Sequence, residues 1–219
     1  MDMTSAPRLS SAPSTAPART RLLDAALQVI RTKGYTATTV DDICAAAGVT
    51  KGSFFHHFKG KEDLGITAAH HWGEVTGAMF AAADYHAPAD PRERVLGYLA
   101  LRTALLEGEL PDVTCLLGTM VQETYATHPA IRNACQAVIH AHADTVAEDL
   151  AAAKARHAPQ AAWDPQEVSL YFQAVLQGAF VLAKAEGSAG VARRCVPPLR
   201  AYVETVLLPT AAAPPASAD

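Results

Sequence analysis

The chain has 219 residues and a formal net charge of −4, from 18 Lys and Arg against 22 Asp and Glu. Half of the residues are hydrophobic, so a sizeable core can be buried, either in one compact unit or in a small head fused to a larger body. Aromatic residues make up only 6% and alanine is abundant, a balance that favours helix over sheet.

Charge is distributed unevenly along the chain. Residues 1–61 carry eight Lys and Arg against four Asp and Glu, whereas the remainder carries ten against eighteen. A basic N-terminal part on an acidic remainder indicates that a polyanion would bind the N-terminal part only.

Simple patterns disfavour several classes of protein. The four cysteines, Cys44, Cys115, Cys135 and Cys195, form no CxxC pair, so neither a zinc site nor a disulfide framework is predicted. No apolar run reaches the about 20 residues that a membrane span needs, and the N-terminus lacks the apolar stretch of a secretory signal. We therefore expect a reduced, cytoplasmic protein without membrane contact.

The first elements in chain order are an arm and a helix. Residues 1–18 are rich in Ser, Ala, Pro and Thr and are predicted to be disordered, as are residues 209–219. A first helix is expected to start with Thr20 as its N-cap and to end at Gly34. Its apolar positions fall on one face at Leu23, Ala26, Leu27 and Ile30.

Two short helices follow. The first starts at Thr39 and Asp42, which have the spacing of a capping box, and is ended by Gly48. Thr50 is expected to cap the second, which runs to Phe58.

The rest of the chain also indicates helices, separated by Pro and Gly. They are expected over residues 61–84, 91–107, 112–125, 130–156, 165–186 and 191–207. The sequence therefore predicts an all-α fold of about nine helices. We expect residues 19–64 to be a helix-turn-helix domain and residues 65–208 to be the second domain.

The two short helices carry the best candidate for a binding site. They are joined by a tight turn at Gly48, with small residues where they must pack closely, as in a helix-turn-helix. The second helix would enter the major groove of DNA with its N-terminal end first. There, Gly52 allows a close approach of the backbone, and Thr50 and Ser53 can donate to phosphates.

Residues 20–64 resemble the TetR family of transcription regulators, in order and without gaps. The resemblance lies in Leu22-Leu23-Asp24-Ala25-Ala26, Gly34-Tyr35, Ile43-Cys44-Ala45-Ala46-Ala47-Gly48-Val49, Lys51-Gly52-Ser53-Phe54-Phe55-His56-His57-Phe58 and Lys61-Glu62-Asp63-Leu64. It implies a homodimer that binds double-stranded DNA at a palindromic operator and responds to a small-molecule effector.

The resemblance also implies which residues contact bases or phosphates: Thr39, Thr50, Lys51, Gly52, Ser53, Phe55, His57 and Lys61. The family usually has Tyr where this chain has Phe55, so a phosphate hydrogen bond worth about 1 kcal/mol is expected to be missing. His56 or Lys59 is a candidate to compensate. Phe54, Phe58 and Tyr35 are interpreted as core residues.

The second domain has no catalytic signature, such as a phosphate-binding Gly loop, HExxH or GxSxG, so we expect neither an enzyme nor a cofactor nor a metal site. The resemblance implies an apolar effector pocket in a helical bundle. The apolar lining is predicted to include Phe80, Met120, Phe172, Leu176 and Phe180, and the polar groups Gln122, Glu123, Tyr125 and Gln173.

Two segments of this domain resemble a subgroup of the family in which some members sense electrophiles with a cysteine and a lysine. They are Cys115-Leu116 and Gln177-Gly178-Ala179-Phe180-Val181-Leu182-Ala183-Lys184. Cys115 and Lys184 are therefore a candidate thiol sensor, since a nearby ammonium would make a thiol more reactive. The favoured interpretation is that Cys115 is a small buried residue and Lys184 a surface charge.

The last two helices are expected to form a four-helix dimer interface, as the resemblance implies. The helically spaced candidates are Val168, Tyr171, Val175, Gly178, Leu182, Val196, Leu199, Val203 and Val206.

The sequence thus indicates a repressor that leaves its operator when an effector binds and shifts the helix after the head. Two alternatives stay open: a repressor that senses electrophiles through Cys115, and a helical binding protein or enzyme with a vestigial head. Activation in place of repression is also open.

Overall fold

The computed structural model describes residues 15–208, so the predicted tail and all but the last residues of the predicted arm lie outside the described residues. The described part is helical. Its α-helices are α1 (Ala18–Lys33), α2 (Val40–Ala47), α3 (Lys51–His57), α4 (Lys61–Ala81), α5 (Pro91–Ala104), α6 (Leu110–Val113), α7 (Leu116–Thr124), α8 (Pro129–His157), α9 (Pro165–Glu186) and α10 (Gly190–Tyr202). A 3₁₀ turn (Asp84–His86) follows α4, and a π-helical turn (Val203–Leu207) follows α10.

The predicted all-α fold is confirmed, with two local differences. The helix expected over residues 112–125 is divided into α6 and α7, because Thr114 between them is extended. The first helix begins at Ala18, not after Thr20, with Pro17 in the N-cap position. The fixed φ of a proline suits a helix start, and the carbonyl of Pro17 accepts from the amide of Arg21.

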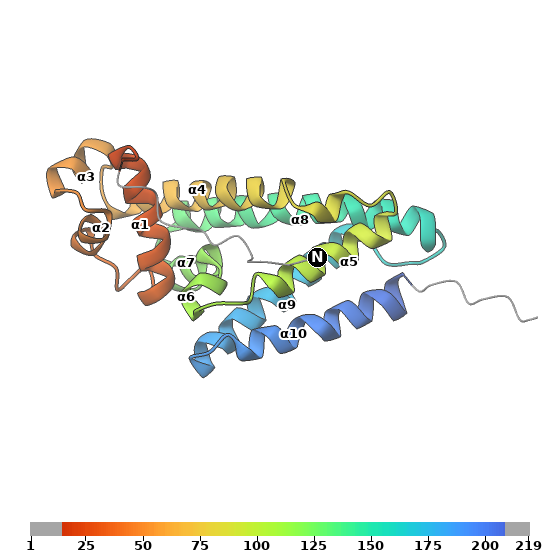
Figure 1. The fold of residues 1–219 in the computed structure, drawn as a ribbon. Coiled ribbons are helices and arrows are strands. Elements are labelled where there is room, and N and C mark those ends of the chain that lie inside the picture. Colours follow the sequence, from red (N-terminus) through yellow and green to blue (C-terminus); the bar gives the residue numbers. More distant parts are fainter. Residues whose placement is uncertain (1–14, 209–219) are drawn as a thin grey trace, which may run out of the picture.

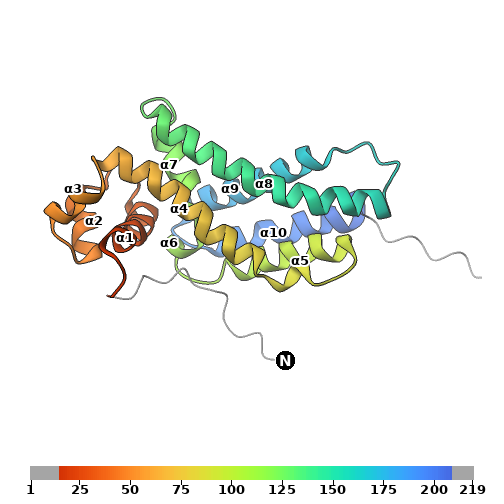
Figure 2. The ribbon, with the colours of Figure 1, turned by 90° about the horizontal axis from the view of Figure 1, so that it is seen from above.

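The helices form a small head and an elongated body (Figure 1). Helices α1–α3 gather at one end, and α4 leads from them into the body beside α8. Helix α9 packs between α8 and α10, and α5 packs on α8 and α10. The view from above in Figure 2 shows α4 and α8 crossing the length of the body.

One apolar core joins the head to the body. Leu22, Ile30, Ile43 and Phe54 of the head share a continuous cluster of buried side chains with Leu64, Met120 and Ile131 of α4, α7 and α8. Tyr35 and Phe58 are buried in the same cluster, which confirms their interpretation as core residues. The head is therefore packed on α4, α7 and α8 and is not tethered by a free linker.

Helix α9 is long and apolar enough to span a membrane, and no other described helix is. The sequence analysis expected no such helix. In the structure, α9 packs against α8 on one side and α10 on another, so its apolar composition fits a central helix of the bundle.

Candidate nucleic-acid interface and internal cavity

Local hydrogen bonds fix the start of both short helices in the head. The hydroxyl of Thr39 accepts from the Asp42 amide at 3.1 Å, and the Asp42 carboxylate accepts from the Thr39 amide at 2.7 Å. This is the predicted capping box. Gly48 ends α2 with a left-handed φ of 61°, and the hydroxyl of Thr50 then accepts from the Ser53 amide at the start of α3.

Helix α3 buries one face and exposes the other. Phe54 and Phe58 are buried in the core, whereas Lys51, Gly52, Phe55 and His56 are exposed and Ser53 and His57 are half-buried. Phe55 is 58% exposed, which is unusual for so large an apolar side chain. The predicted contact residues of α3 therefore lie on a surface that a partner can reach.

Gly52 is not required by the packing of the chain itself. Its φ is not positive, and a Cβ built on it would meet only the Thr50 hydroxyl, at an ordinary 3.7 Å. The absence of a side chain there leaves room on the outer surface of α3, where a partner backbone would approach.

The structure gives Thr39 and Lys51 partners within the head. The Thr39 hydroxyl donates to the Asp42 carboxylate at 2.6 Å, so its hydrogen is already used. Lys51 forms an ion pair of 2.9 Å with Asp41 on α2, and the hydrogen bond that its ammonium donates to this carboxylate raises the pKa of Lys51. Both side chains are well exposed, so a phosphate can displace this weak pair.

The structure gives Lys61 contacts within the head that the sequence did not indicate. Its ammonium donates to three carbonyls of the α1–α2 connection, those of Tyr35 (3.1 Å), Thr36 (3.3 Å) and Thr38 (3.0 Å). It also lies 4.5 Å from the centre of the Tyr35 ring. An ammonium has three hydrogens, so none is left for a phosphate. Lys61 thus fastens the start of α4 to the end of α1.

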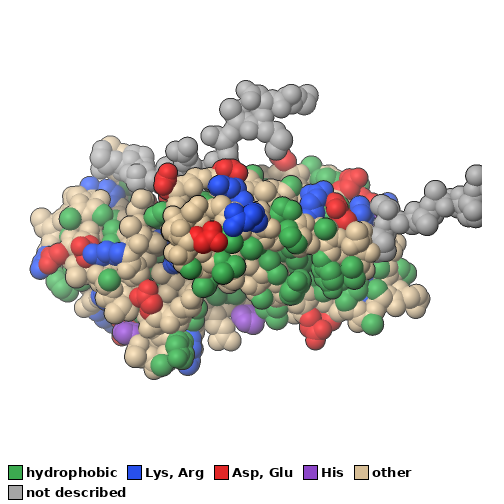
Figure 3. Space-filling view, turned by 90° about the horizontal axis from the view of Figure 1, so that it is seen from below, with side chains coloured by type: hydrophobic (Ala, Val, Ile, Leu, Met, Phe, Trp, Pro, Cys, Tyr) green, Lys and Arg blue, Asp and Glu red, His purple; other side chains and the backbone are tan. Residues whose placement is uncertain are grey.

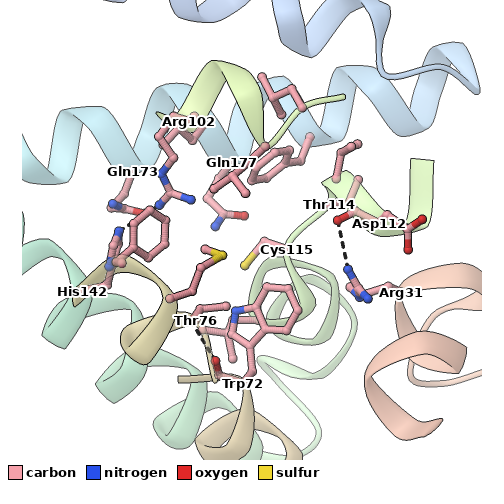
Figure 4. A pocket seen from close by; sticks show the side chains of 18 of the residues that line it. Arg31, Trp72, Thr76, Arg102, Asp112, Thr114, Cys115, His142, Gln173 and Gln177 are labelled. Atoms are coloured by element: carbon pink, nitrogen blue, oxygen red, sulfur yellow. Dashed lines mark hydrogen bonds between the residues drawn. The ribbon is translucent and has the colours of Figure 1, made fainter. Parts of the chain in front are cut away.

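The body contains an internal cavity of about 300 Å³ (Figure 4). It is lined from α1, α4, α5, α8, α9 and the segment from Leu105 to Leu117, and Figure 4 shows Trp72 and Cys115 near its middle. Arg102, His142 and Gln173 lie together at one end, and Arg31 and Asp112 at the other. Its lining combines apolar side chains with a few polar groups, as is usual for a small-molecule site.

Four predicted lining residues, Phe80, Gln173, Leu176 and Phe180, line this cavity. The other five do not. Met120 is buried in the core shared with the head, and Phe172 is buried in a second core cluster together with Leu99 and Val146. Tyr125 is exposed, and Gln122 bonds to the carbonyl of Gly118 in its own helix. Periodicity identifies the buried face of a helix but not which of two cores it faces.

Glu123 lies at the boundary between head and body. Its carboxylate accepts from the amide of Thr36 at 2.7 Å, and it packs against Gly34, whose φ of 89° suits glycine. Glu123 therefore holds α7 to the turn after α1 and is not part of the cavity wall.

The sequence patterns did not point to the charged groups of the cavity. Arg102 and His142 interrupt otherwise apolar faces of α5 and α8, a signal that could have identified them. Arg31 belongs to the head, yet it is buried and lines the cavity. It donates to the carbonyls of Leu27 (3.0 Å) and Asp112 (3.1 Å). Burial lowers the pKa of Arg31, and the Asp112 carboxylate opposes that shift.

Cys115 lines the cavity, and Lys184 approaches the same segment. The Lys184 ammonium bonds to the Thr119 hydroxyl, which donates to the carbonyl of Cys115 at 2.9 Å. Partial burial lowers the pKa of Lys184, and the nearby Glu123 and Cys115 oppose that shift. Within residues 15–208, no group of three or more His, Cys, Asp or Glu side chains could hold a metal ion.

The structure divides the predicted dimer residues into two sets. Tyr171, Gly178, Leu182 and Val206 are exposed, and Val175 is half-buried. Val168, Val196, Leu199 and Val203 are buried within the chain, which corrects their assignment. Both faces of α9 carry apolar side chains, so helical spacing alone does not show which of them turns inward. The apolar stripe of α10 faces the protein's own core.

A head with two capped short helices and an exposed second helix, packed on a helical body with a cavity, is typical of helix-turn-helix transcription regulators. Comparison with known proteins specifies it further. Residues 22–65 match "Bacterial regulatory proteins, tetR family", and residues 91–197 match "Tetracyclin repressor-like, C-terminal domain".

The chain is 31% identical to the transcriptional regulator AcuR of Cereibacter sphaeroides over 183 residues, which cover 82% of each protein. The fold is similar to that of regulatory protein TetR from Rhodobacter sphaeroides, with a TM-score of 0.75, 24% identity and coverage of 85% of this chain and 99% of that one. It is also similar to that of reduced NemR from E. coli, with a TM-score of 0.75, 19% identity and coverage of 89% and 99%. The chain belongs to the TetR family of transcriptional regulators.

Proposed function

We propose that this regulator is a cytoplasmic repressor that binds a palindromic operator as a homodimer through α3 and leaves it when a small molecule fills the body cavity. The observation that carries the proposal is the outer face of α3. Lys51, Gly52, Phe55 and His56 are exposed there on a helix that Phe54 and Phe58 anchor in the core. Within this proposal, residues 19–64 are the DNA-binding domain and residues 65–208 bind the effector and the second copy.

The exposed apolar side chains of α9 and α10 support the dimer. Leu170, Tyr171, Val181 and Leu182 of α9, with Tyr202 and Val206 near the C-terminal end, are large and exposed. Figure 3 shows hydrophobic side chains gathered on the underside of the body, where α9 and α10 lie. A two-fold pairing of such a face would set two α3 helices about 35 Å apart, one turn of DNA, and requires a palindromic site.

Two connections from the cavity to the head support the proposed release. Helix α4 carries Trp72 and Phe80 in the cavity wall and begins directly behind α3. Arg31 of α1 reaches the wall as well and bonds to Asp112. A ligand that prefers one arrangement of α4 and α1 would therefore change the placement of the head. The free energy that couples ligand binding to DNA release is then limited by the difference in the ligand's affinity for the two arrangements.

Selection of binding sites from random duplex DNA tests the proposal. Purified wild-type protein is expected to enrich a palindrome whose binding weakens as salt rises. Lys51→Gln should bind it more weakly with a shallower salt dependence. Arg132→Gln removes an exposed charge on α8 and should bind as wild type does. No enrichment by a well-folded protein would instead favour a binding protein with a vestigial head.

One observation favours a second candidate function, the sensing of electrophiles. Cys115 lies in the cavity wall, and the Lys184 ammonium bonds to the Thr119 hydroxyl, which donates to the carbonyl of Cys115. A thiol in that position can be alkylated by a ligand that enters the cavity. Cys115→Ser distinguishes electrophile sensing from reversible effector binding. If an inducer that releases the wild type from DNA no longer releases the variant, the response depends on thiol chemistry. If the variant still responds, the inducer binds reversibly.

A further inference from the structure

One end of the cavity holds a positive charge that no described carboxylate neutralises. Arg102 takes part in no ion pair within residues 15–208. Its Nε donates to the Tyr98 hydroxyl at 2.8 Å, and its Nη2 lies 2.9 Å from Nε2 of His142. The described residues give Nη1 no hydrogen-bond acceptor, so the outer edge of the guanidinium is available to a ligand.

The neighbours of Arg102 leave this charge unbalanced. Burial lowers the pKa of His142 to about 3, and the nearby positive charge of Arg102 is the second cause of this shift. The imidazole is therefore neutral at physiological pH and accepts from Arg102. The guanidinium also lies 4.6 Å from the centre of the Phe80 ring, an apolar neighbour that neutralises nothing. At the other end of the cavity, by contrast, Arg31 has the Asp112 carboxylate nearby.

An unpartnered amide lies at the same end. Gln173 is only 7% exposed, and its Nε2 has no hydrogen-bond partner. Figure 4 shows Gln173 beside Arg102 and His142. A buried donor without an acceptor costs free energy, which a ligand acceptor at this point would recover. Arg102 and Gln173 thus present hydrogen-bond donors in one place.

The rest of the wall suits an apolar, flat ligand body. Trp72 and Phe180 contribute aromatic rings, and Met79 and Leu176 contribute flexible and branched apolar surface. The volume of about 300 Å³ lies at the small end of the range of ligand pockets, about 300–1,000 Å³. A compact molecule with one polar group at the Arg102 end and an apolar body fits this part of the cavity.

We propose that the cavity binds a small organic acid. Its carboxylate accepts from Nη1 of Arg102 and from Nε2 of Gln173, and its apolar body lies against Trp72 and Phe180. A planar carboxylate matches the fork of donors on a guanidinium, and its negative charge balances that of Arg102, which forms no ion pair within residues 15–208. This inference rests on the proposed function in one respect, that the occupant of the cavity is the effector.

The chain contains a reporter for binding. It has two tryptophans, Trp72 in the cavity wall and Trp163 outside it, so Trp163→Phe leaves Trp72 as the only fluorophore of its type. The full chain with this substitution is titrated with benzoate and hexanoate, with the matched amides benzamide and hexanamide, and with benzylamine. At least one acid is expected to change the fluorescence saturably, with its amide bound at least about tenfold more weakly.

Three variants assign the binding to the proposed groups. Arg102→Gln should weaken acid binding by about tenfold or more, and Arg102→Lys, which keeps the charge, should bind more tightly than Arg102→Gln. Gln173→Glu should also weaken it, because a second carboxylate repels the ligand and competes for Arg102. Arg132→Gln removes one exposed charge on the same protein and should bind as the parent does. Thermal unfolding of each variant shows that it is folded.

Three outcomes overturn the proposal: no acid binds, the amides or benzylamine bind as tightly as the acids, or Arg102→Gln binds as tightly as Arg132→Gln. Release of the selected operator DNA is measured separately. Release by a neutral or cationic compound rejects the ligand class and leaves the repressor intact. Acid binding by a protein that recognises no operator supports the ligand class and rejects the repressor.

Discussion

Lys61 has one role according to the sequence, a phosphate contact, and another according to the structure, a bond between the head's first turn and α4. As a phosphate contact, it would contribute to operator affinity alone. In the structure its ammonium instead bonds to the carbonyls of Tyr35, Thr36 and Thr38, which belong to the connection after α1. Lys61→Gln shortens the side chain and removes its charge and one of its three donors, so its main effect should be on folding.

The expected loss in the free energy of unfolding follows from the three hydrogen bonds of the Lys61 ammonium. Hydrogen bonds from a charged donor are worth about 1.5–3 kcal/mol each when well buried. Here the group is partly solvated, and fixing a lysine side chain costs up to about 2 kcal/mol in rotamer entropy. The net loss is therefore expected to be about 2 kcal/mol, which lowers Tm by about 4–8 °C for a chain of this size.

The assay measures Tm and the salt dependence of operator binding for Lys61→Gln and for Lys51→Gln. Lys61→Gln should lower Tm and leave the slope of log K against log salt unchanged. Lys51→Gln should leave Tm unchanged and reduce the slope by about 1.8, one phosphate contact in each of two heads. A wild-type Tm for Lys61→Gln together with a reduced slope would refute the structural assignment.

Three further predictions concern the head and the dimer. Phe55→Tyr adds a hydroxyl on the exposed face of α3 and should tighten operator binding about fivefold for each head, or about 30-fold for the dimer, and an unchanged gel-shift titration would show that no phosphate lies in reach. The hydrogen-bonded ion pair with Lys33, followed in size by the hydrogen bonds with Thr39, lowers the pKa of Asp42. The ionised Asp42 carboxylate therefore stabilises the fold above its unfolded pKa of about 3.9. This stabilisation is lost as pH falls toward the lower folded pKa. The urea midpoints of wild type and Asp42→Asn should hence differ at pH 6, and the difference should shrink as pH falls below about 3.9; a constant difference would contradict this. Leu182→Glu, on the exposed face of α9, should sediment as a folded monomer, whereas Leu182→Ala should retain more dimer; a stable dimer of Leu182→Glu would place the interface elsewhere.

Local rules of the chain predicted much of the head. The capping box at Thr39 and Asp42, the cap at Thr50 and the left-handed Gly48 are all present, because each bond joins residues within four positions of each other. The exposed face of α3 also follows from local spacing, since buried Phe54 and Phe58 are one turn apart. The sequence therefore determined the helix-turn-helix and the surface that it presents.

Only the tertiary structure decided which helix faces meet. Periodicity identified Val196 and Phe172 as apolar stripe residues, but the packing of α8, α9 and α10 turned both inward. The cavity joins Arg31 of α1, Arg102 of α5 and Gln173 of α9, which are far apart along the chain. Hydrogen bonds and charges at such sites depend on where distant helices pack, and no local pattern encodes that arrangement.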